Sequence, residues 1–317
     1  MSVIAETIEI LKEKSPAPHQ EVWIDDLVIG VFFTGVKLST GHAGVAFTPI
    51  GEIPEAVCCP TTAARMPQAG NFEGSPVSEI LKYALDTNVL KSAIGVATLN
   101  ALTQWIIESE EEGGYHLIQD KDGFDLLEIQ PHETVSLIGA FGPYIRRLKT
   151  MGNPFFIIEK NAQTLKPDEM KFFKPESEMR NALEKSSVVI ITGTAIVNHT
   201  IDPILSLITN GKRTAIIGPT ASMIPEAFFK RGLQVMAGVK ILKPDLMIKI
   251  LKQGGSAYHL LKECSDKIAF VNPVRNSSGA LNPALRGGTP YGAEPGIILK
   301  SNPAAAAGPE GPAGHYF

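Results

Sequence analysis

Glycine-containing turns with hydroxyl or aromatic side chains follow three apolar runs in the second half of the chain, at residues 139–143, 192–199 and 218–222. Glycine lets a backbone turn tightly, and the amide groups at the start of a following helix bind anions. Hydroxyl and amide side chains orient a polar ligand. The candidate ligand-binding residues are Gly139, Phe141, Gly142 and Pro143 in the first turn, Thr192, Gly193, Thr194 and Asn198 in the second, and Gly218, Pro219 and Thr220 in the third.

A carboxylate, Glu159, ends a further apolar run 20 residues after Gly139. Dinucleotide-binding domains hold an acidic residue near this spacing, where it binds ribose hydroxyls. A solvated carboxylate beside Lys160 is the alternative interpretation. The turn at 139–143 lacks the full G-x-G-x-x-G fingerprint, so it can equally be a tight turn that only packs a helix on a strand.

The three turns are expected to lie together. The carboxyl ends of neighbouring parallel strands meet at one edge of a sheet, so turns that follow such strands line one crevice. Helix capping by Thr200 or Asp202 is the alternative explanation for part of this polar composition.

Two histidines in polar turns, His42 and His199, are the candidate metal ligands. The sequence has no C-x-x-C pair and no H-E-x-x-H motif, which argues against a preformed structural zinc site. Cys58 and Cys59 are adjacent and cannot easily reach one tetrahedral ion together. The other histidines are expected at the surface or in satisfied polar contacts. A serine nucleophile elbow, G-x-S-x-G, is also absent.

The first part of the chain is expected to differ in architecture from the part that holds the three turns. Its first fifty residues are rich in β-branched and aromatic residues with short polar breaks, which predicts an antiparallel meander of three strands. These strands span residues 22–30, 31–38 and 43–48. Residues 49–74 contain four prolines and little periodicity, which predicts a long irregular segment. Helices are expected over 75–85, which starts at Ser75-Pro76, and over 90–106, where apolar residues recur every three to four positions.

From residue 134 onward, short apolar runs alternate with amphipathic stretches that carry proline in the first turn. The runs span residues 135–138, 155–158, 188–191, 214–217, 234–239 and 267–271. Strands this uniformly apolar are covered on both faces, which is typical of a parallel sheet. The pattern predicts a doubly wound, Rossmann-like α/β domain.

The chain is expected to comprise two domains and a tail. Its 317 residues exceed the size that one core usually serves. We predict an α+β domain over 1–115, a Rossmann-like domain over 116–271 and a tail over 272–317. Half of the tail is Gly, Ala or Pro, so we expect it to be extended or disordered.

The composition is that of an ordinary globular protein, with 44% hydrophobic residues and a net charge of −4. There is no basic excess to release counterions from nucleic acid, and no apolar run is long enough for a membrane span. The first 14 residues lack the features of a signal peptide, and three cysteines make no disulfide framework. We therefore expect a cytoplasmic protein with neither nucleic-acid nor membrane partners, and a homodimer as the commonest assembly.

Several of these segments together resemble a known family. They are GVFFTGVKL at 30–38, GVAFT at 44–48, and the three turns. In this order they are similar to the DUF364 family, whose proposed role is heavy-metal chelation. Its members carry an N-terminal DUF4213 domain that resembles the N-terminal domain of enolase. The resemblance covers roughly residues 1–271 and implies an enolase-N-like domain packed on a Rossmann-like domain. His199 stands where the family pattern implies glycine.

By this resemblance, the turns would bind a transition metal ion, a metal chelate or another small anion in a cleft between the two domains. The enolase likeness carries no enolase chemistry, since the catalytic barrel has no counterpart. The leading hypothesis is a binding protein of metal homeostasis. The alternative is an enzyme that uses a nucleotide-type cofactor, S-adenosylmethionine or NAD, in the Rossmann-like domain. A third hypothesis is an interaction protein with a vestigial crevice.

Overall fold

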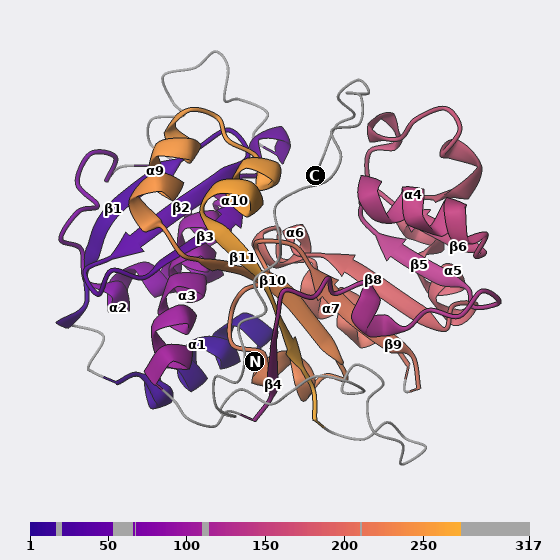
Figure 1. The fold of residues 1–317 in the computed structure, drawn as a ribbon, viewed down its shortest axis with the longest axis horizontal. Coiled ribbons are helices and arrows are strands. Elements are labelled where there is room, and N and C mark those ends of the chain that lie inside the picture. Colours follow the sequence, from indigo (N-terminus) through magenta and orange to yellow (C-terminus); the bar gives the residue numbers. More distant parts are fainter. Residues whose placement is uncertain (17–20, 53–65, 67, 110–113, 210, 274–317) are drawn as a thin grey trace, which may run out of the picture.

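The computed structural model describes residues 1–16, 21–52, 66, 68–109, 114–209 and 211–273 (Figure 1). Most of the predicted irregular segment, with Cys58 and Cys59, and residues 274–317 of the predicted tail lie outside the described residues. The helices are α1 (Val3–Lys14), α2 (Val77–Ile80), α3 (Val89–Ser109), α4 (Gly142–Met151), α5 (Met179–Glu184), α6 (Thr194–Val197), α7 (Ile201–Leu207), α8 (Glu226–Phe229), α9 (Pro244–Lys252) and α10 (Ala257–Glu263). The strands are β1 (Ile24–Ile29), β2 (Phe33–Leu38), β3 (Ala43–Phe47), β4 (His116–Gln119), β5 (Val135–Ile138), β6 (Phe155–Ile158), β7 (Phe173–Lys174), β8 (Val188–Thr192), β9 (Arg213–Ile217), β10 (Val235–Ile241) and β11 (Ser265–Val271).

Strands β1, β2 and β3 form the predicted antiparallel meander. Helix α3 packs on β2 and β3, and α9 packs on β1 and β2 (Figure 1). The approach of β3 to α3 is close: a Cβ atom on Gly44 would lie 2.3 Å from the carbonyl oxygen of Ala97 and 2.4 Å from the amide nitrogen of Ala101. Glycine is therefore required here by space.

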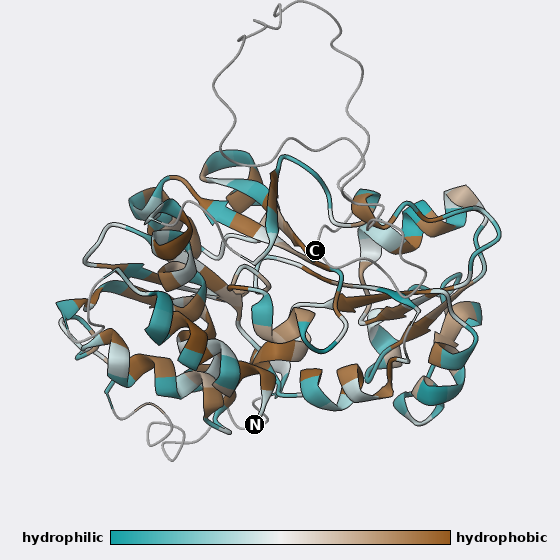
Figure 2. Cartoon of the chain, turned by 90° about the horizontal axis from the view of Figure 1, so that it is seen from below, coloured by the Kyte–Doolittle hydropathy of each residue, from teal (hydrophilic) through white to brown (hydrophobic). Residues whose placement is uncertain are grey.

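Helix α3 is buried on nearly all sides and joins the two sheets. Figure 2 shows that hydrophobic residues gather on the inner strands and helices, and hydrophilic residues on the outer helices and loops. The Asn100 amide of α3 donates to the carbonyl oxygens of Val45 at 2.7 Å and Thr220 at 3.0 Å. The Thr103 hydroxyl accepts from the amide of Ile224 at 3.0 Å. Polar groups on α3 thus bond to both halves of the chain. No helix in the described part of the chain, α3 included, has the length and apolar character to cross a membrane.

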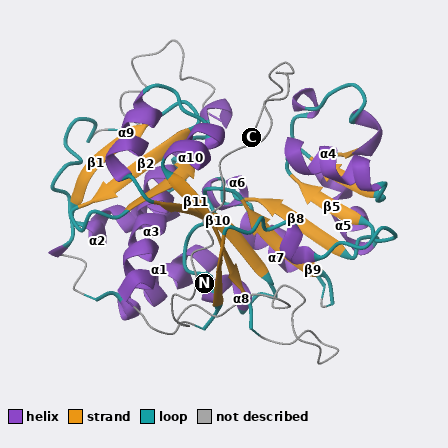
Figure 3. Cartoon of the chain, in the orientation of Figure 1, coloured by secondary structure: helices purple, strands orange, loops and turns teal. Residues whose placement is uncertain are grey.

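The larger sheet has eight strands in the order β4-β11-β10-β9-β8-β5-β6-β7 (Figure 3). The strands from β10 to β7 are parallel, so five of the six predicted apolar runs are confirmed as parallel strands. The chain adds β6 and β7 on one side of β5 and then returns to add β8, β9 and β10 on its other side. The direction of winding therefore switches between β5 and β8.

The sixth run, β11, is antiparallel to β10, contrary to the prediction of an all-parallel sheet. Two successive helices, α9 and α10, lie between β10 and β11, and they return the chain to the carboxyl end of β10, where β11 begins. The amide of Leu242 donates to the carbonyl of Cys264 at 2.8 Å, which holds the two ends of this excursion together. β4 lies on β11, also antiparallel. It was not predicted, and it lies directly after the predicted domain boundary at residue 115.

Candidate functional site

The three predicted turns contact one another at the carboxyl ends of β5, β8 and β9. A Cβ atom on Gly139 would lie 2.5 Å from the Thr192 side chain, and one on Gly193 would lie 3.0 Å from that of Thr220. Gly218 comes within 3.7 Å of the Gly193 amide by the same measure. Gly139 has φ of 101° and Gly218 has φ of 136°, so both positions favour glycine. The turns therefore converge at the switch point of the sheet.

Most amides of these turns are engaged within the protein. The amide of Ala140 donates to the Glu159 carboxylate at 2.9 Å, and that of Phe141 donates to the Gly139 carbonyl at 3.0 Å. The amides of Gly193 and Gly218 donate to the carbonyls of Ile217 at 3.0 Å and Ala237 at 2.9 Å. These four amides are not available to an anion.

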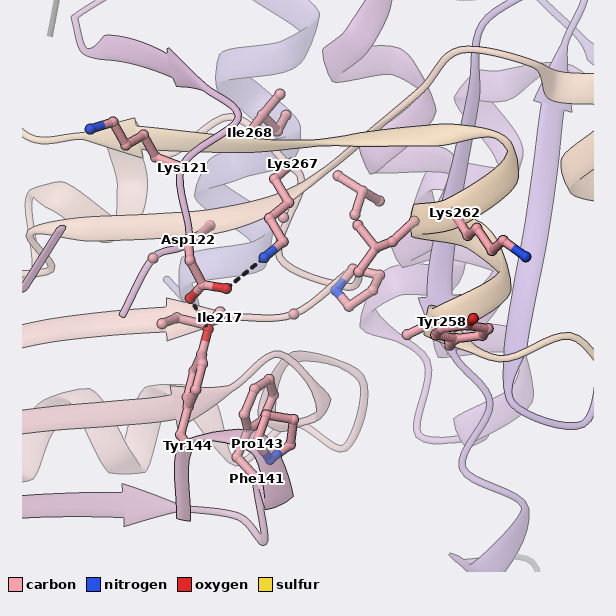
Figure 4. Close-up of a pocket in the computed structure, with 18 residues that line it drawn as sticks. Lys121, Asp122, Phe141, Pro143, Tyr144, Ile217, Tyr258, Lys262, Lys267 and Ile268 are labelled. Carbon is pink, nitrogen blue, oxygen red and sulfur yellow. Dashed lines mark hydrogen bonds and ion pairs between the residues drawn. The ribbon is translucent and has the colours of Figure 1, made fainter. Parts of the chain in front are cut away.

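The first of two cavities near these turns, cavity 1, has a volume of about 450 Å³ (Figure 4). Aromatic and apolar residues form most of its wall, which also includes three lysines, Lys121, Lys262 and Lys267, and one carboxylate, Asp122. Figure 4 shows Lys267 directed at Asp122, whereas the ammonium groups of Lys121 and Lys262 point away from it. The other residues of the wall are Gly123, Phe141, Pro143, Tyr144, Ile217, Gly218, Pro219, Ala237, Gly238, Val239, Ala257, Tyr258, Leu261 and Ile268.

Asp122 is the centre of a polar cluster in cavity 1. Its carboxylate accepts from the Tyr144 hydroxyl at 2.5 Å, the Lys267 ammonium at 2.7 Å and the Phe124 amide at 3.0 Å. Burial acts to raise the pKa of Asp122, but these hydrogen bonds outweigh it and leave the pKa lowered. Burial and the adjacent Asp122 charge raise the pKa of Tyr144 above its usual range. Asp122 is therefore an acceptor and Tyr144 a donor at neutral pH.

Substitution of Asp122 by asparagine is expected to destabilise the protein by about 1–3 kcal/mol at neutral pH, because three donors lose their charged acceptor. The carboxylate pKa is lower in the folded than in the unfolded state, so its stabilising effect is present above about pH 4 and is lost as pH falls through the folded-state pKa. Urea unfolding at pH 7 and pH 3 measures this. An equal loss at both pH values would contradict the ionised cluster.

The second cavity, cavity 2, has a volume of about 310 Å³ and lies at the carboxyl ends of β5, β6 and β8. Ile138 and Ile158 in its wall pack in a different buried cluster from Ile217 and Ala237 of cavity 1. The two cavities therefore flank opposite faces of the sheet. The remaining residues of the wall are Gly139, Glu159, Lys160, Glu176, Met179, Thr192, Thr194, Ala195, Asn198, His199, Thr200, Pro203, Ile204 and Leu207.

The predicted site residues divide between these cavities. Phe141, Pro143, Gly218 and Pro219 line cavity 1, and Gly139, Glu159, Thr192, Thr194, Asn198 and His199 line cavity 2. Gly142, Gly193 and Thr220 line neither. Thr220 is 2% exposed, and its hydroxyl accepts from the amide of Phe47 at 2.9 Å, so it joins the two halves of the chain.

The three turns thus line two separate cavities, and neither cavity lies between the two predicted domains. No residue before Lys121 lines either cavity. The junction between the halves is filled by α3 and its contacts. The sequence did not indicate five polar or aromatic residues of cavity 1, because they lie outside the three turns and share no motif. They are Asp122, Tyr144, Tyr258, Lys262 and Lys267.

The two candidate metal ligands, His42 and His199, lie apart and are both hydrogen-bonded. The His42 ring lies 3.0 Å from Glu108 and 3.0 Å from Thr40, and that of His199 lies 2.9 Å from the carbonyl of Asp86. Within the described residues, no group of three or more His, Cys, Asp or Glu could hold a metal ion. The described residues therefore do not bring together enough side-chain ligands to bind a metal ion on their own. His199 has φ of 59°, the left-handed conformation that glycine favours, as the family resemblance implied.

These features define an α/β protein in which a small antiparallel sheet packs, through one buried helix, on a mostly parallel sheet with cavities at its carboxyl ends. Residues 122–270 match the DUF364 family and residues 11–103 match DUF4213, both described as "Putative heavy-metal chelation". The chain belongs to the DUF364 family and carries the DUF4213 domain ahead of it.

Relatives of the chain share its fold. A crystal structure of a DUF364 protein of unknown function from Pyrococcus horikoshii is 21% identical, with a TM-score of 0.65 over 84% of this chain and 99% of that chain. One from Desulfitobacterium hafniense is 19% identical, with a TM-score of 0.64 over 84% and 98%. An uncharacterized protein of Methanocaldococcus jannaschii is 26% identical over 193 residues, which are 60% of this chain and 70% of that protein.

Proposed function

We propose that the protein binds a small organic anion in cavity 1, either free or as the chelator around a metal ion. The observation that carries this proposal is the wall of cavity 1, where three lysines accompany one carboxylate beside aromatic rings. The rings of Phe141 and Tyr144 lie 4.3 Å apart between centroids. A mostly apolar cavity with a few convergent polar groups is the usual form of a small-molecule site.

The described residues fit the heavy-metal chelation of the family description better if the metal binds as a complex with an organic ligand than if it binds as a bare ion. A metal that arrives with its organic ligand does not need three protein donors, and the described residues do not provide three together. The chelator would supply the negative charge, which Lys121 and Lys262 attract. Lys262 lies 3.5 Å from the exposed Glu263, a weak pair in water.

We also propose that residues 116–271 form a Rossmann-like domain on an enolase-N-like domain of residues 1–115. The strand order supports the first part, since counting from β5 it follows the sequence 3-2-1-4-5-6 of doubly wound nucleotide-binding sheets. The meander followed by α2 and α3 supports the second. Ligands of such sheets bind outside the carboxyl ends of the strands, where cavity 1 lies.

Calorimetry with pyridine-2,6-dicarboxylate, an aromatic dianion that also chelates divalent metals, tests the proposal. The full-length protein, purified without metal, is titrated with this anion, its Zn²⁺ complex, benzene-1,3-dicarboxylate and Zn²⁺ alone. We expect the dicarboxylates or the complex to bind with a stoichiometry of one, more weakly at high salt. Binding of Zn²⁺ alone, with no binding of any organic anion, would overturn the proposal.

A further inference from the structure

Cavity 2 differs from cavity 1 in its chemistry and position. It lies at the switch point, where β5 and β8 are neighbours and the chain departs on both sides. Such points bind ligands in doubly wound sheets because the loops on either side diverge. No residue lines both cavities. Cavity 2 is therefore treated as a separate candidate ligand site.

Part of the wall of cavity 2 is apolar. Ile138 and Ile158 come from the sheet, Met179 from α5, and Ile204 and Leu207 from α7. These side chains offer a hydrocarbon surface to a ligand within a volume of about 310 Å³. A flat heterocycle is the kind of group that such a surface takes from water.

The wall of cavity 2 also holds oriented hydrogen-bonding groups. The Glu159 carboxylate accepts from the amides of Ala140 at 2.9 Å and Asn161 at 3.2 Å, so its position is fixed. An ionised carboxylate has about four acceptor sites, which leaves two for a ligand with adjacent hydroxyl donors. The hydroxyls of Thr192 and Thr194 lie 2.7 Å apart and add donor and acceptor groups to the same wall.

The charges of cavity 2 disfavour a phosphate. The wall of cavity 2 includes two carboxylates, Glu159 and Glu176, and one lysine, Lys160. The ring of His199 is hydrogen-bonded to the carbonyl of Asp86. The turn amides that bind phosphate in dinucleotide sites are engaged at Ala140 and Phe141. The part of a ligand that enters cavity 2 should therefore be neutral, with a flat ring and a diol.

We propose that cavity 2 binds the nucleoside part of a small molecule, with the ribose diol on Glu159 and the base on the apolar wall. A free nucleoside, NAD and S-adenosylmethionine share this chemistry, and any phosphate would lie outside cavity 2. The proposal does not depend on ligand binding in cavity 1, because the two walls have no residue in common.

Calorimetry on the full-length protein tests this site with the four ribonucleosides, 2′-deoxyadenosine, NAD and S-adenosylmethionine. We expect at least one ribonucleoside to bind. If that is adenosine, we expect the 2′-deoxy form to bind about tenfold more weakly or worse, the usual effect of losing a hydrogen bond to a charged group. Tighter binding of NAD or S-adenosylmethionine than of adenosine would identify the natural carrier of the nucleoside.

Two variants locate the site. Glu159→Gln should weaken ribonucleoside binding about tenfold and reduce the preference over the 2′-deoxy form. Leu207→Trp, at a partly exposed wall position, should obstruct the cavity and remove binding. Glu184→Gln, an equal charge change at an exposed position outside the cavity, is the matched control and should bind normally.

Each result decides the proposal independently of cavity 1. Circular dichroism and an unchanged midpoint of urea unfolding would show that the variants fold. Absence of binding by every nucleoside, NAD and S-adenosylmethionine would overturn the proposal. So would binding that neither Glu159→Gln nor Leu207→Trp weakens.

Discussion

Replacing Gly44 by alanine is expected to destabilise the protein by about 3 kcal/mol, the upper part of the range for overpacking a buried position. The added methyl group would lie 2.3 Å from the Ala97 carbonyl oxygen and 2.4 Å from the Ala101 amide nitrogen. Both are backbone atoms of α3, which is buried on nearly all sides and cannot easily shift. Strand β3 must move away from the helix instead, which loosens the contact between the two sheets.

The midpoint of urea unfolding measures this effect, with Gly51→Ala as the matched control. Gly51 is exposed, lacks a positive φ and has no atom within 4 Å of an added Cβ. Its substitution should change stability by less than about 0.5 kcal/mol, as is usual at the surface. If both variants unfold at the wild-type midpoint, the packing of β3 on α3 is not as described.

Reversing two charges at the rim of cavity 1, with Lys121→Glu and Lys262→Glu together, is expected to weaken binding of pyridine-2,6-dicarboxylate at least tenfold. The wall then changes from three lysines and one aspartate to one lysine and three acidic residues. Each exposed charge pair contributes only about 0.2–1 kcal/mol, but a dianion gains two repulsions and loses two attractions at once. Both lysine side chains are exposed, so we expect the double variant to fold normally.

Calorimetry in low and high salt measures the effect of this double reversal. The difference between variant and wild type should shrink as salt rises, because salt screens exposed charges. Lys82→Glu with Lys185→Glu changes the net charge equally at exposed positions outside both cavities and should leave affinity nearly unchanged. Equal losses in both double variants would show that total charge, and not cavity 1, determines binding.

The parallel strands could be predicted from the sequence because burial on both faces leaves uniformly apolar runs, as in β5, β6 and β8. Helix α3 was predicted from its apolar periodicity, but its role as the core between two sheets was not. The polar side chain of Asn100 at its centre gives no sequence signal for burial, and its burial depends on the Val45 and Thr220 carbonyls.

Cavity 1 could not be predicted because its polar groups depend on strand direction. Lys267 stands near the start of β11, opposite Val239 of β10. Only an antiparallel β11 places that start at the carboxyl end of β10, beside the turn at Gly218. β4 runs antiparallel to β11 in turn, so Asp122, three residues after the end of β4, reaches the same edge. An all-parallel sheet would put Lys267 at the opposite edge.

Glu159 shows the opposite case, since the sequence indicated its place. It directly follows β6 and lines cavity 2 together with Gly139, which stands 20 residues before it. What the spacing did not indicate is that its carboxylate occupies the Ala140 amide. That contact removes an anion-binding group from the turn and makes the carboxylate itself the acceptor for a ligand.

The most direct test of the binding proposal is a crystal of the protein with the Zn²⁺ complex of pyridine-2,6-dicarboxylate, measured at the zinc absorption edge. We expect one anomalous peak inside cavity 1, with the metal held by the organic ligand and the ring near Phe141 and Tyr144. A zinc peak held directly by protein side chains, with cavity 1 free of the dicarboxylate, would contradict it.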